Sequence, residues 1–305
     1  MLHRIVPAHR EGFDPNRDLH VTPDVLAAVI TATRAQGFAF VTLDEAMDRL
    51  HGRAAAAPFA CLTFDDGYRD NLDLALPVCA RLDAPFTVYV TTGFVDRSAD
   101  IWWYALEALL REAERVEIDG AAVPAATAAE KAAAFRRLAG QLRVLGPAAM
   151  RAAIDAMAAR HGAGFRAGAA ALAMDWDMVA ALDRSGVGAV EAHGVSHAAL
   201  ARLDAADARA EAAESRRRLE ALLGRPVRHF AFPFGDPPSA GAREFALCGE
   251  LGFASAMTTR FGNLAAAAAA TPWSLPRVPV NGFDDARTVA VKVSGLAAWL
   301  RRLAG

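Results

Sequence analysis

The fold can be traced outward from one stretch of the chain, Pro58-Phe59-Ala60-Cys61-Leu62-Thr63-Phe64-Asp65-Asp66-Gly67. Its apolar part predicts a buried strand, and the glycine after the two carboxylates allows a sharp turn. Because neighbouring strand residues point to opposite faces, Asp65 and Asp66 can share a pocket only where the strand breaks into a loop. Two buried carboxylates side by side also need a cation or a shared proton. The stretch therefore predicts a strand that ends at a cation-binding pocket.

A second motif offers ligands for that cation. The segment Glu191-Ala192-His193-Gly194-Val195-Ser196-His197 ends an apolar, strand-like run that begins at Val187, and its histidines are four residues apart. Asp66, His193 and His197 would give three protein ligands and leave coordination positions open, as in catalytic zinc sites. Taken alone, an acidic pair before a glycine indicates a solvated turn, and two histidines at this spacing indicate an exposed helix face. The apolar run before His193 argues against the second interpretation.

These motifs, in this order, resemble those of the polysaccharide deacetylases of carbohydrate esterase family four, the NodB homology domain. The family's TFDDG, paired-histidine and proline-aromatic-glycine motifs correspond to Thr63 to Gly67, His193 to His197, and Phe232-Pro233-Phe234-Gly235. Flanking matches are Gly67-Tyr68-Arg69-Asp70-Asn71, Ala75-Leu76-Pro77-Val78, Thr91-Thr92-Gly93-Phe94 and Leu275-Pro276-Arg277. The resemblance covers most of residues 1–110 and 174–285.

The resemblance implies a metal-dependent hydrolase that acts on carbon–nitrogen (non-peptide) bonds and removes N-acetyl or O-acetyl groups from a polysaccharide or glycan precursor. It implies that Asp66, His193 and His197 hold the metal, Zn²⁺ first, with Co²⁺ or Ni²⁺ as alternatives. It also implies that Asp65 is the base and that the backbone N–H of Phe234 helps to hold the oxyanion. Pro233 would then lie beside the substrate, although a rigid Pro-Gly turn is the plainer interpretation of this motif.

The chain departs from the family pattern at three places. Ala231 stands where many members have an arginine that orients the base, and Arg277 is the candidate to supply that guanidinium from a later strand. Gly194 replaces the usual hydroxyl residue after the first histidine. The family's C-terminal histidine acid is absent, because no histidine follows His229. His3 and His229 are the candidates to protonate the leaving amine, and an ordinary structural role stays open for both.

Alternating helical and strand patterns predict a mostly parallel sheet. Helices are expected over 23–36, 43–50, 71–82, 204–223 and 242–251, and strands over 38–42, 58–62, 85–91, 187–192, 227–232, 253–258 and 275–280. Ligands at strand carboxyl ends favour a barrel, and the family implies a distorted one. The expected α/β fold is therefore a distorted (β/α) barrel of the polysaccharide deacetylase type over 1–100 and 174–290, with a helical insertion or cap over 101–173 and a C-terminal helix over 291–305. Trp102 and Trp103 begin the insertion and could stack on sugar rings or form core between cap and barrel.

Composition limits the partners. The 33 basic and 35 acidic residues give a net charge of −2, which does not favour nucleic acid. Cys61, Cys79 and Cys248 are odd in number and read as reduced structural thiols. No run of about 18 apolar residues predicts a membrane span, and no signal peptide is evident. We therefore expect a cytoplasmic protein as the sequence stands, or an exported one if the true start lies upstream.

The expected partner is an acetylated amino-sugar glycan or its precursor, and the oligomeric state stays open. Two alternatives stay open for the function. One is a hydrolase of the same fold that cleaves another carbon–nitrogen bond in a small cyclic amide or imide. The other is a non-catalytic glycan-binding module that keeps its metal as structure.

Overall fold

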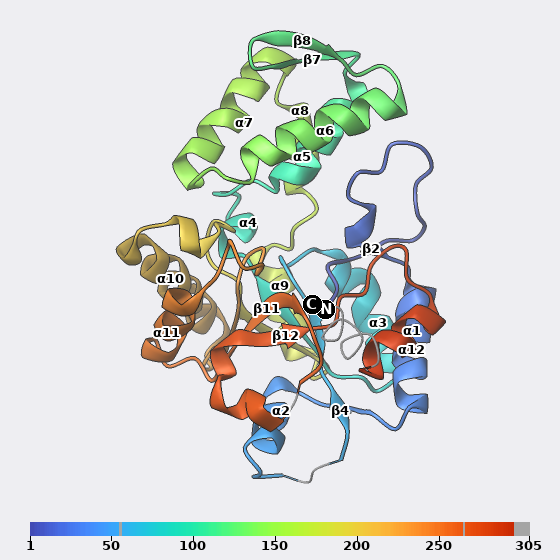
Figure 1. The fold of residues 1–305 in the computed structure, drawn as a ribbon, viewed down its shortest axis with the longest axis vertical. Coiled ribbons are helices and arrows are strands. Elements are labelled where there is room, and N and C mark those ends of the chain that lie inside the picture. The colour runs from blue at the N-terminus through green and yellow to red at the C-terminus, as the bar shows by residue number, and fades with distance from the viewer. Residues whose placement is uncertain (55–56, 265, 296–305) are drawn as a thin grey trace.

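A computed structural model describes residues 1–54, 57–264 and 266–295. Figure 1 shows two bodies, a lower one that contains both ends of the described chain and an upper, mainly helical one built from residues 101–173. We call them the barrel body and the insertion. The short helix α4 (Thr92–Val95) lies where they meet.

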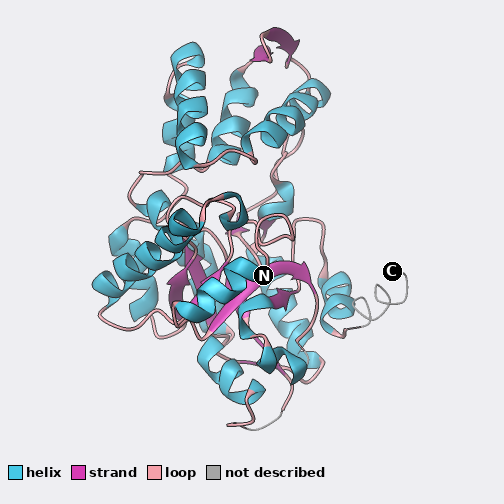
Figure 2. Cartoon of the chain, turned by 60° about the vertical axis from the view of Figure 1, so that its left-hand side comes forward, coloured by secondary structure: helices cyan, strands magenta, loops and turns pink. Residues whose placement is uncertain are grey.

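The barrel body is organised by one curled sheet of six parallel strands in the order β12-β11-β10-β9-β6-β5. Figure 2 shows its strands at the centre of the barrel body, with helices around them. The strands are β5 (Leu62–Phe64), β6 (Phe86–Val90), β9 (Gly188–Ala192), β10 (His229–Ala231), β11 (Ser255–Phe261) and β12 (Leu275–Arg277). All pairs in this sheet are parallel, so the strands' carboxyl ends share one rim.

The N-terminal residues bridge the two outer strands of this sheet. The backbone N–H of Leu2 donates to Thr63 on β5, and Asp65 donates back to Leu2. On the other side, Val280, just beyond β12, donates to the carbonyl of Met1. The sheet therefore curls into a distorted barrel, as expected, and its closure is made by the first residues of the chain.

Local capping explains the predicted helices of the barrel body. Thr22 caps α1 (Pro23–Ala35) by accepting from the N–H of Val25, and proline occupies the first turn. Asp204 caps α10 (Ala205–Leu223), which ends at the left-handed Gly224. Both helices are confirmed. The other helices of this body are α2 (Leu43–Leu50), α3 (Leu76–Arg81), α9 (Trp176–Arg184), α11 (Ala242–Glu250) and α12 (Ala286–Val293).

Several predicted elements are shorter or divided, and proline explains two of them. The helix expected over 71–82 is a wide turn, η2 (Asn71–Ala75), followed by α3, because Pro77 cannot donate to the helical ladder. The strand expected over 275–280 ends at Arg277, before Pro279. The strand expected over 38–42 is only β3 (Ala39–Phe40), which pairs with β4 (Phe59–Ala60) in a separate ribbon. Helix α9 was not predicted.

The expected C-terminal helix over 291–305 is corrected for the part that is described. Helix α12 begins at Ala286, where Asp285 caps it, and ends at Val293. Residues 296–305 lie outside the described residues. The remaining short elements are β1 (Arg4–Ile5), β2 (His20–Val21), η1 (Arg17–Leu19), η3 (Leu200–Arg202), η4 (Ala266–Ala270) and η5 (Pro272–Ser274).

The insertion has an apolar core of its own. It consists of α5 (Trp102–Glu112), the antiparallel hairpin β7 (Arg115–Ile118) and β8 (Ala121–Pro124), and the helices α6 (Ala128–Leu142), α7 (Pro147–His161) and α8 (Gly164–Ala170). Its core side chains include Leu106, Leu109, Phe135, Leu138, Ile154 and Phe165, and this cluster continues into the barrel body through Tyr68 and Phe94. The insertion is therefore packed onto the barrel body through a shared apolar cluster.

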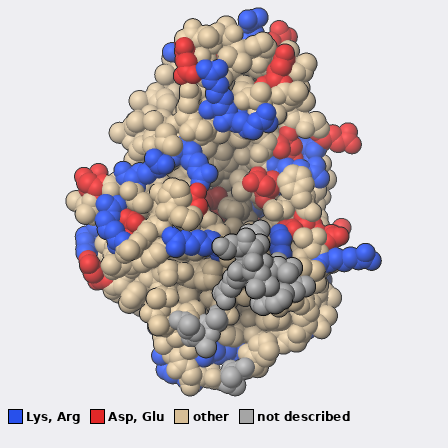
Figure 3. Space-filling model, in the orientation of Figure 1, with Lys and Arg blue, Asp and Glu red and all other residues tan. Residues whose placement is uncertain are grey.

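Surface chemistry agrees with the balanced composition. On the face shown in Figure 3, basic and acidic side chains alternate and no broad basic area forms. Within the described residues, no helix combines the length and apolarity needed to cross a bilayer. The three cysteines are free thiols, and burial raises the pKa of Cys61 and of Cys79 to about 12.

Candidate metal centre and active site

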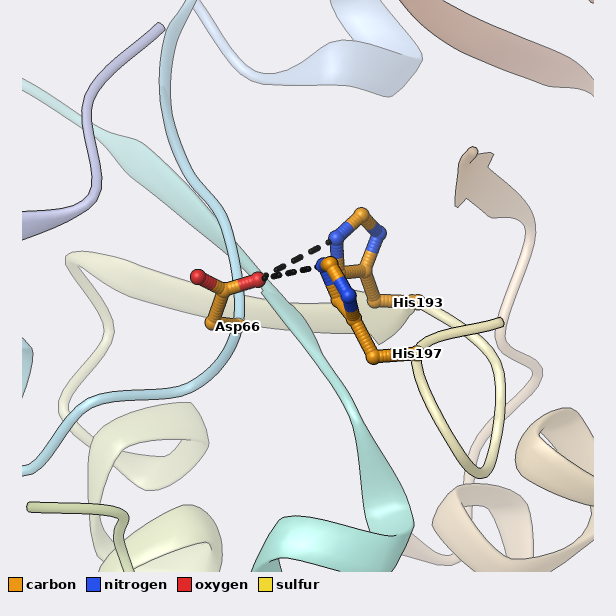
Figure 4. Close-up of side chains that lie close together, drawn as sticks. All are labelled: Asp66, His193 and His197. Atoms are coloured by element: carbon orange, nitrogen blue, oxygen red, sulfur yellow. Dashed lines mark ion pairs between the residues drawn. The ribbon is translucent and has the colours of Figure 1, made fainter. Parts of the chain in front are cut away.

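The side chains of Asp66, His193 and His197 converge at the carboxyl rim of the sheet. Asp66 follows β5, and the histidines lie in the loop after β9. The Oδ1 atom of Asp66 is 3.1 Å from Nε2 of His197 and 3.4 Å from Nε2 of His193 (Figure 4). Within the described residues this is the one group of three or more His, Cys, Asp and Glu side chains whose ligand atoms all lie within 4.8 Å of one another.

The donor set fits a divalent metal. Nδ1 of His193 lies 2.7 Å from the carbonyl oxygen of Ala231, which can only accept, so Nδ1 carries the proton and Nε2 presents a lone pair. That lone pair faces a carboxylate oxygen, Oδ1 of Asp66, which is buried without a hydrogen-bond partner among the described residues. Two lone pairs that face each other in a buried pocket need a cation between them. Two imidazole nitrogens and one carboxylate oxygen are the ligands that zinc takes in catalytic sites.

The electrostatics of the pocket keep Asp66 charged. Burial opposes ionisation of this carboxyl, and the pKa of Asp66 is held well below its usual value only by positive charge beside it: from protonated His197 and His193 or, where both imidazoles are neutral, from a cation between them. The side chain of Asp66 is only 3 % exposed, so little water screens these interactions.

An unusual backbone conformation brings the ligands together. Asp66, His197 and Phe234 all have positive φ values, of 78°, 58° and 60°. Such a conformation costs a residue other than glycine about 1–3 kcal/mol and persists only where the surroundings enforce it. At Asp66 it turns the chain out of β5, which answers how two adjacent carboxylates reach one pocket. Gly194 has a φ of 77°, so the residue that departs from the family pattern occupies a position that favours glycine.

Asp65 lies beside the candidate metal ligands, in a buried ion pair with Arg277. The guanidinium nitrogens Nη1 and Nη2 each lie 2.6 Å from one carboxylate oxygen of Asp65, and Nε donates to the carbonyl of Thr258. Burial would raise the pKa of Asp65, but the charge of Arg277 outweighs it and holds the pKa below the usual value. Arg277 on β12 thus supplies the guanidinium that contacts Asp65, and Ala231 on β10 has no charged group to do so.

The turn at residues 233–236, here called the Phe234 turn, borders the same site. The ring of Phe234 lies 4.7 Å from the ring of His197, centroid to centroid. Thr259 on β11 holds the turn from one side: its hydroxyl donates to the carbonyl of Phe234, and its N–H donates to that of Gly235. Pro233 begins this turn, is buried and lies close to Gly194; it is not among the residues that line the cavity beside His197, and its contact with a substrate stays a prediction.

The two candidate acids lie at different ends of the barrel. His3 follows the bridge between Leu2 and β5. The negative charges of Asp66 and Asp65 act to raise its pKa. Burial lowers the pKa of His3 more than those charges raise it. His229 stands at the amino end of β10, where its ring contacts Ser255 and Asp44. The structure therefore brings His3 to the site and keeps His229 in a structural cluster away from it.

The two tryptophans of α5 have different surroundings. Trp103 donates to the hydroxyl of Tyr68, and its ring lies 4.9 Å from the ring of His197, so it forms core between insertion and barrel. Trp102 is also largely buried but lines a cavity of about 220 Å³ beside the candidate ligand His197. His197, Phe234, Arg143 and Met150 line the same cavity. The insertion therefore supplies one wall of the site.

Two residues that hold the site were not found from the sequence. Glu211 on α10 accepts from the N–H groups of Val195 and Ser196 and from the Ser196 hydroxyl, so it fixes the loop between the histidines. Arg143, which immediately follows α6, contacts the Phe234 turn. Glu211 is one of many charged residues on α10, and Arg143 follows the alanine-rich α6, so the sequence offers no signal that separates either from its neighbours.

Comparisons with family models and with solved structures point to the same family. The family model described as polysaccharide deacetylase matches residues 52–249. Among solved structures, the Streptococcus pyogenes deacetylase PplD in complex with acetate is 17 % identical, covers 96 % of both chains and has a TM-score of 0.64. IcaB from Ammonifex degensii is 18 % identical, covers 95 % of this chain and 94 % of its own, and has a TM-score of 0.57.

A third structure, the putative polysaccharide deacetylase BA0330 from Bacillus anthracis, is 17 % identical over 96 % of this chain and 67 % of its own, with a TM-score of 0.59. At sequence identities this low, the structural similarity establishes a shared fold and nothing beyond it. No curated protein matched the sequence.

Proposed function

This chain belongs to the polysaccharide deacetylase family, hydrolases that remove acetyl groups from glycans, and we propose that it releases acetate from an N-acetylated amino-sugar unit with the help of a zinc ion. The observation that carries the proposal is the arrangement of four side chains: Asp66, His193 and His197 converge as ligands, while Asp65 lies beside them and is committed to Arg277. The adjacent residues Asp65 and Asp66 can therefore serve as base and metal ligand, because Arg277 holds Asp65 and leaves Asp66 to the metal.

Each residue has a chemical task in amide hydrolysis. A divalent ion at this site, when bound, supplies an acidified water and polarises the acetyl carbonyl. Asp65 would accept a proton from the attacking water, and Arg277 fixes the orientation of both its oxygens. The backbone N–H of Phe234 stabilises the oxyanion that develops on the carbonyl.

The remaining step is protonation of the leaving amine. We assign it to His3, and two observations support this choice: the charges of Asp66 and Asp65 act on His3, whereas the ring of His229 is engaged by Ser255 and Asp44. Because burial lowers its pKa, the resting ring of His3 is mostly neutral and must first take up a proton, and the protonated ring is then a stronger acid than an exposed imidazolium. The C–N bond breaks as the amine takes this proton, and acetate and the free amino sugar are the products.

Zinc is proposed over the alternatives because its donor preference matches two imidazoles and one carboxylate. The cavity beside His197, with Trp102 in its wall, offers an apolar surface for a sugar ring. Internal polymer units, chain ends and small precursors remain equal candidates under this proposal.

The test is acetate release by the zinc-loaded protein from oligomers of N-acetylglucosamine and from a simple acetyl ester. We expect one zinc per chain and turnover in the wild type, and unchanged zinc content with at least a hundredfold lower turnover in Asp65→Asn. Asp73→Asn is the control, since this carboxylate is exposed and pairs with Arg69 on the surface. No acetate from any of these substrates, or full turnover by Asp65→Asn, would overturn the proposal.

A further inference from the structure

Arg143 joins the insertion to the part of the site that would hold the oxyanion. It is the residue that follows α6, and it lines the cavity that His197 and Phe234 also line. We propose that Arg143 is a positioning residue that holds the Phe234 turn in its reactive conformation. The reaction-related part of this inference rests on the proposed function.

Two contacts place Arg143 on the turn. Its Nη2 atom lies 2.6 Å from Oδ2 of Asp236, the last residue of the turn. Its guanidinium carbon also lies 5.0 Å from the centre of the Phe234 ring, within the range of a cation–π interaction. The same ring contacts the metal ligand His197. One side chain of the insertion therefore touches both the aromatic ring and the carboxylate of the turn.

The turn requires such support because its backbone is strained. Phe234 and Gly235 adopt positive φ values of 60° and 63° in succession. Thr259 fixes the carbonyl groups of both residues from the side of β11. On the other side, the carboxylate of Asp236 is held by Arg143 and by the hydroxyl of Ser239. Since an oxyanion donor must stay within about 0.5 Å of its productive position, a support lost on one side matters to the reaction.

The energetics separate positioning from stability. The side chains of Arg143 and Asp236 are 48 % and 34 % exposed, and ion pairs this exposed contribute about 0–1 kcal/mol to folding. Loss of the pair should therefore leave the free energy of unfolding nearly unchanged. A loosened oxyanion donor should nevertheless lower kcat, because its interaction is made chiefly in the transition state.

The experiment compares Arg143→Ala and Arg143→Lys with a matched control, Arg137→Ala. Arg137 lies on the same helix, α6, and forms an exposed ion pair with Asp119 of the hairpin loop, away from the cavity. For each zinc-loaded protein, kcat and KM for acetate release are measured, together with amide hydrogen exchange over residues 232–240.

We expect Arg143→Ala to lower kcat at least fivefold, with KM changed less than kcat, and to speed exchange in the Phe234 turn. Arg143→Lys should recover part of both effects, because lysine keeps the charge but lacks the planar fork. Arg137→Ala should match the wild type within twofold. A wild-type kcat in Arg143→Ala, or an effect confined to KM, would overturn the positioning role.

The exchange measurement keeps the two proposals apart. If amide hydrogen exchange in the Phe234 turn is unchanged in Arg143→Ala, the positioning role of Arg143 is refuted whether or not the protein is active. If the wild type releases no acetate but Arg143→Ala speeds amide hydrogen exchange in the Phe234 turn, the proposed function fails, while the inference that Arg143 holds this turn stands.

Discussion

The buried pair of Asp65 and Arg277 gives the sharpest prediction, the effect of Arg277→Met. Methionine keeps most of the side chain's length and removes its charge and three hydrogen bonds, two to Asp65 and one to the carbonyl of Thr258. The carboxylate of Asp65 is then left in a pocket where its side chain is 3 % exposed, without a partner. Both folding and the proposed reaction depend on that carboxylate.

The magnitude follows from the burial. Removing one partner of a buried ion pair costs about 3–5 kcal/mol, a large part of the total of about 5–15 kcal/mol for a folded protein. By contrast, the exposed pair of Arg69 and Asp73 contributes about 0–1 kcal/mol, so Arg69→Met is the control. We also expect kcat to fall by about a hundredfold or more in Arg277→Met, because the proposed base loses its orientation and its charge.

The assay is urea unfolding followed by circular dichroism at neutral pH, applied to Arg277→Met, Asp65→Asn and the double variant. The losses of unfolding free energy in the two single variants should add up to a value that exceeds the loss in the double variant by about 1 kcal/mol or more, because each single change leaves its partner unpaired. Additive losses, or a value for Arg277→Met within 1 kcal/mol of the wild type, would refute the reasoning from the buried pair.

Three further predictions follow from other features of the site and its surroundings. Asp66→Asn should weaken zinc binding by more than about 100-fold in chelator competition, because a charged ligand is lost; equal affinity would exclude Asp66 from the metal centre. Burial lowers the pKa of His20 to about 4, below the value of about 6.5 in an unfolded chain, so the unfolded state binds the extra proton first as pH falls. The free energy of unfolding should therefore drop by about 3 kcal/mol between pH 6.5 and pH 4, and His20→Gln should lose this part of the pH dependence; identical profiles would contradict it. Gly235→Ala should destabilise by about 1–3 kcal/mol, because a Cβ there would lie 2.7 Å from the nitrogen of Thr259, whereas Gly140→Ala on α6 meets no atom and should melt no lower than the wild type.

Elements with strong local signals were predictable from the sequence. The N-caps of α1 and α10 and the glycine after α10 each act over a few residues. Strand extents that depend on distant partners were harder: the strand expected over 58–62 is divided between β4, which pairs with β3, and β5 of the six-stranded sheet. Helix α9 was not predicted, although Asp175 caps it locally by accepting from the N–H of Met178.

Residues of the site divide in the same way. The motifs around Asp66 and His193 carried their own chemical signature, and the late arginine Arg277 could be nominated as a partner of the base. The choice between His3 and His229 could not be made along the chain. It depends on which end of a strand each ring occupies, and that is set by how the sheet curls.

The residue types and their order along the chain establish which chemistry this protein can support, because the side chains that bind a metal or move a proton can be read directly and their order is typical of one family. Which of these groups meet depends on how distant segments pack. The N-terminal residues close the barrel, and Arg277 reaches Asp65 across 212 positions of chain. The insertion brings Trp102 and Arg143 to the cavity beside His197. Such contacts arise from packing between distant segments, and no local pattern of residues encodes them.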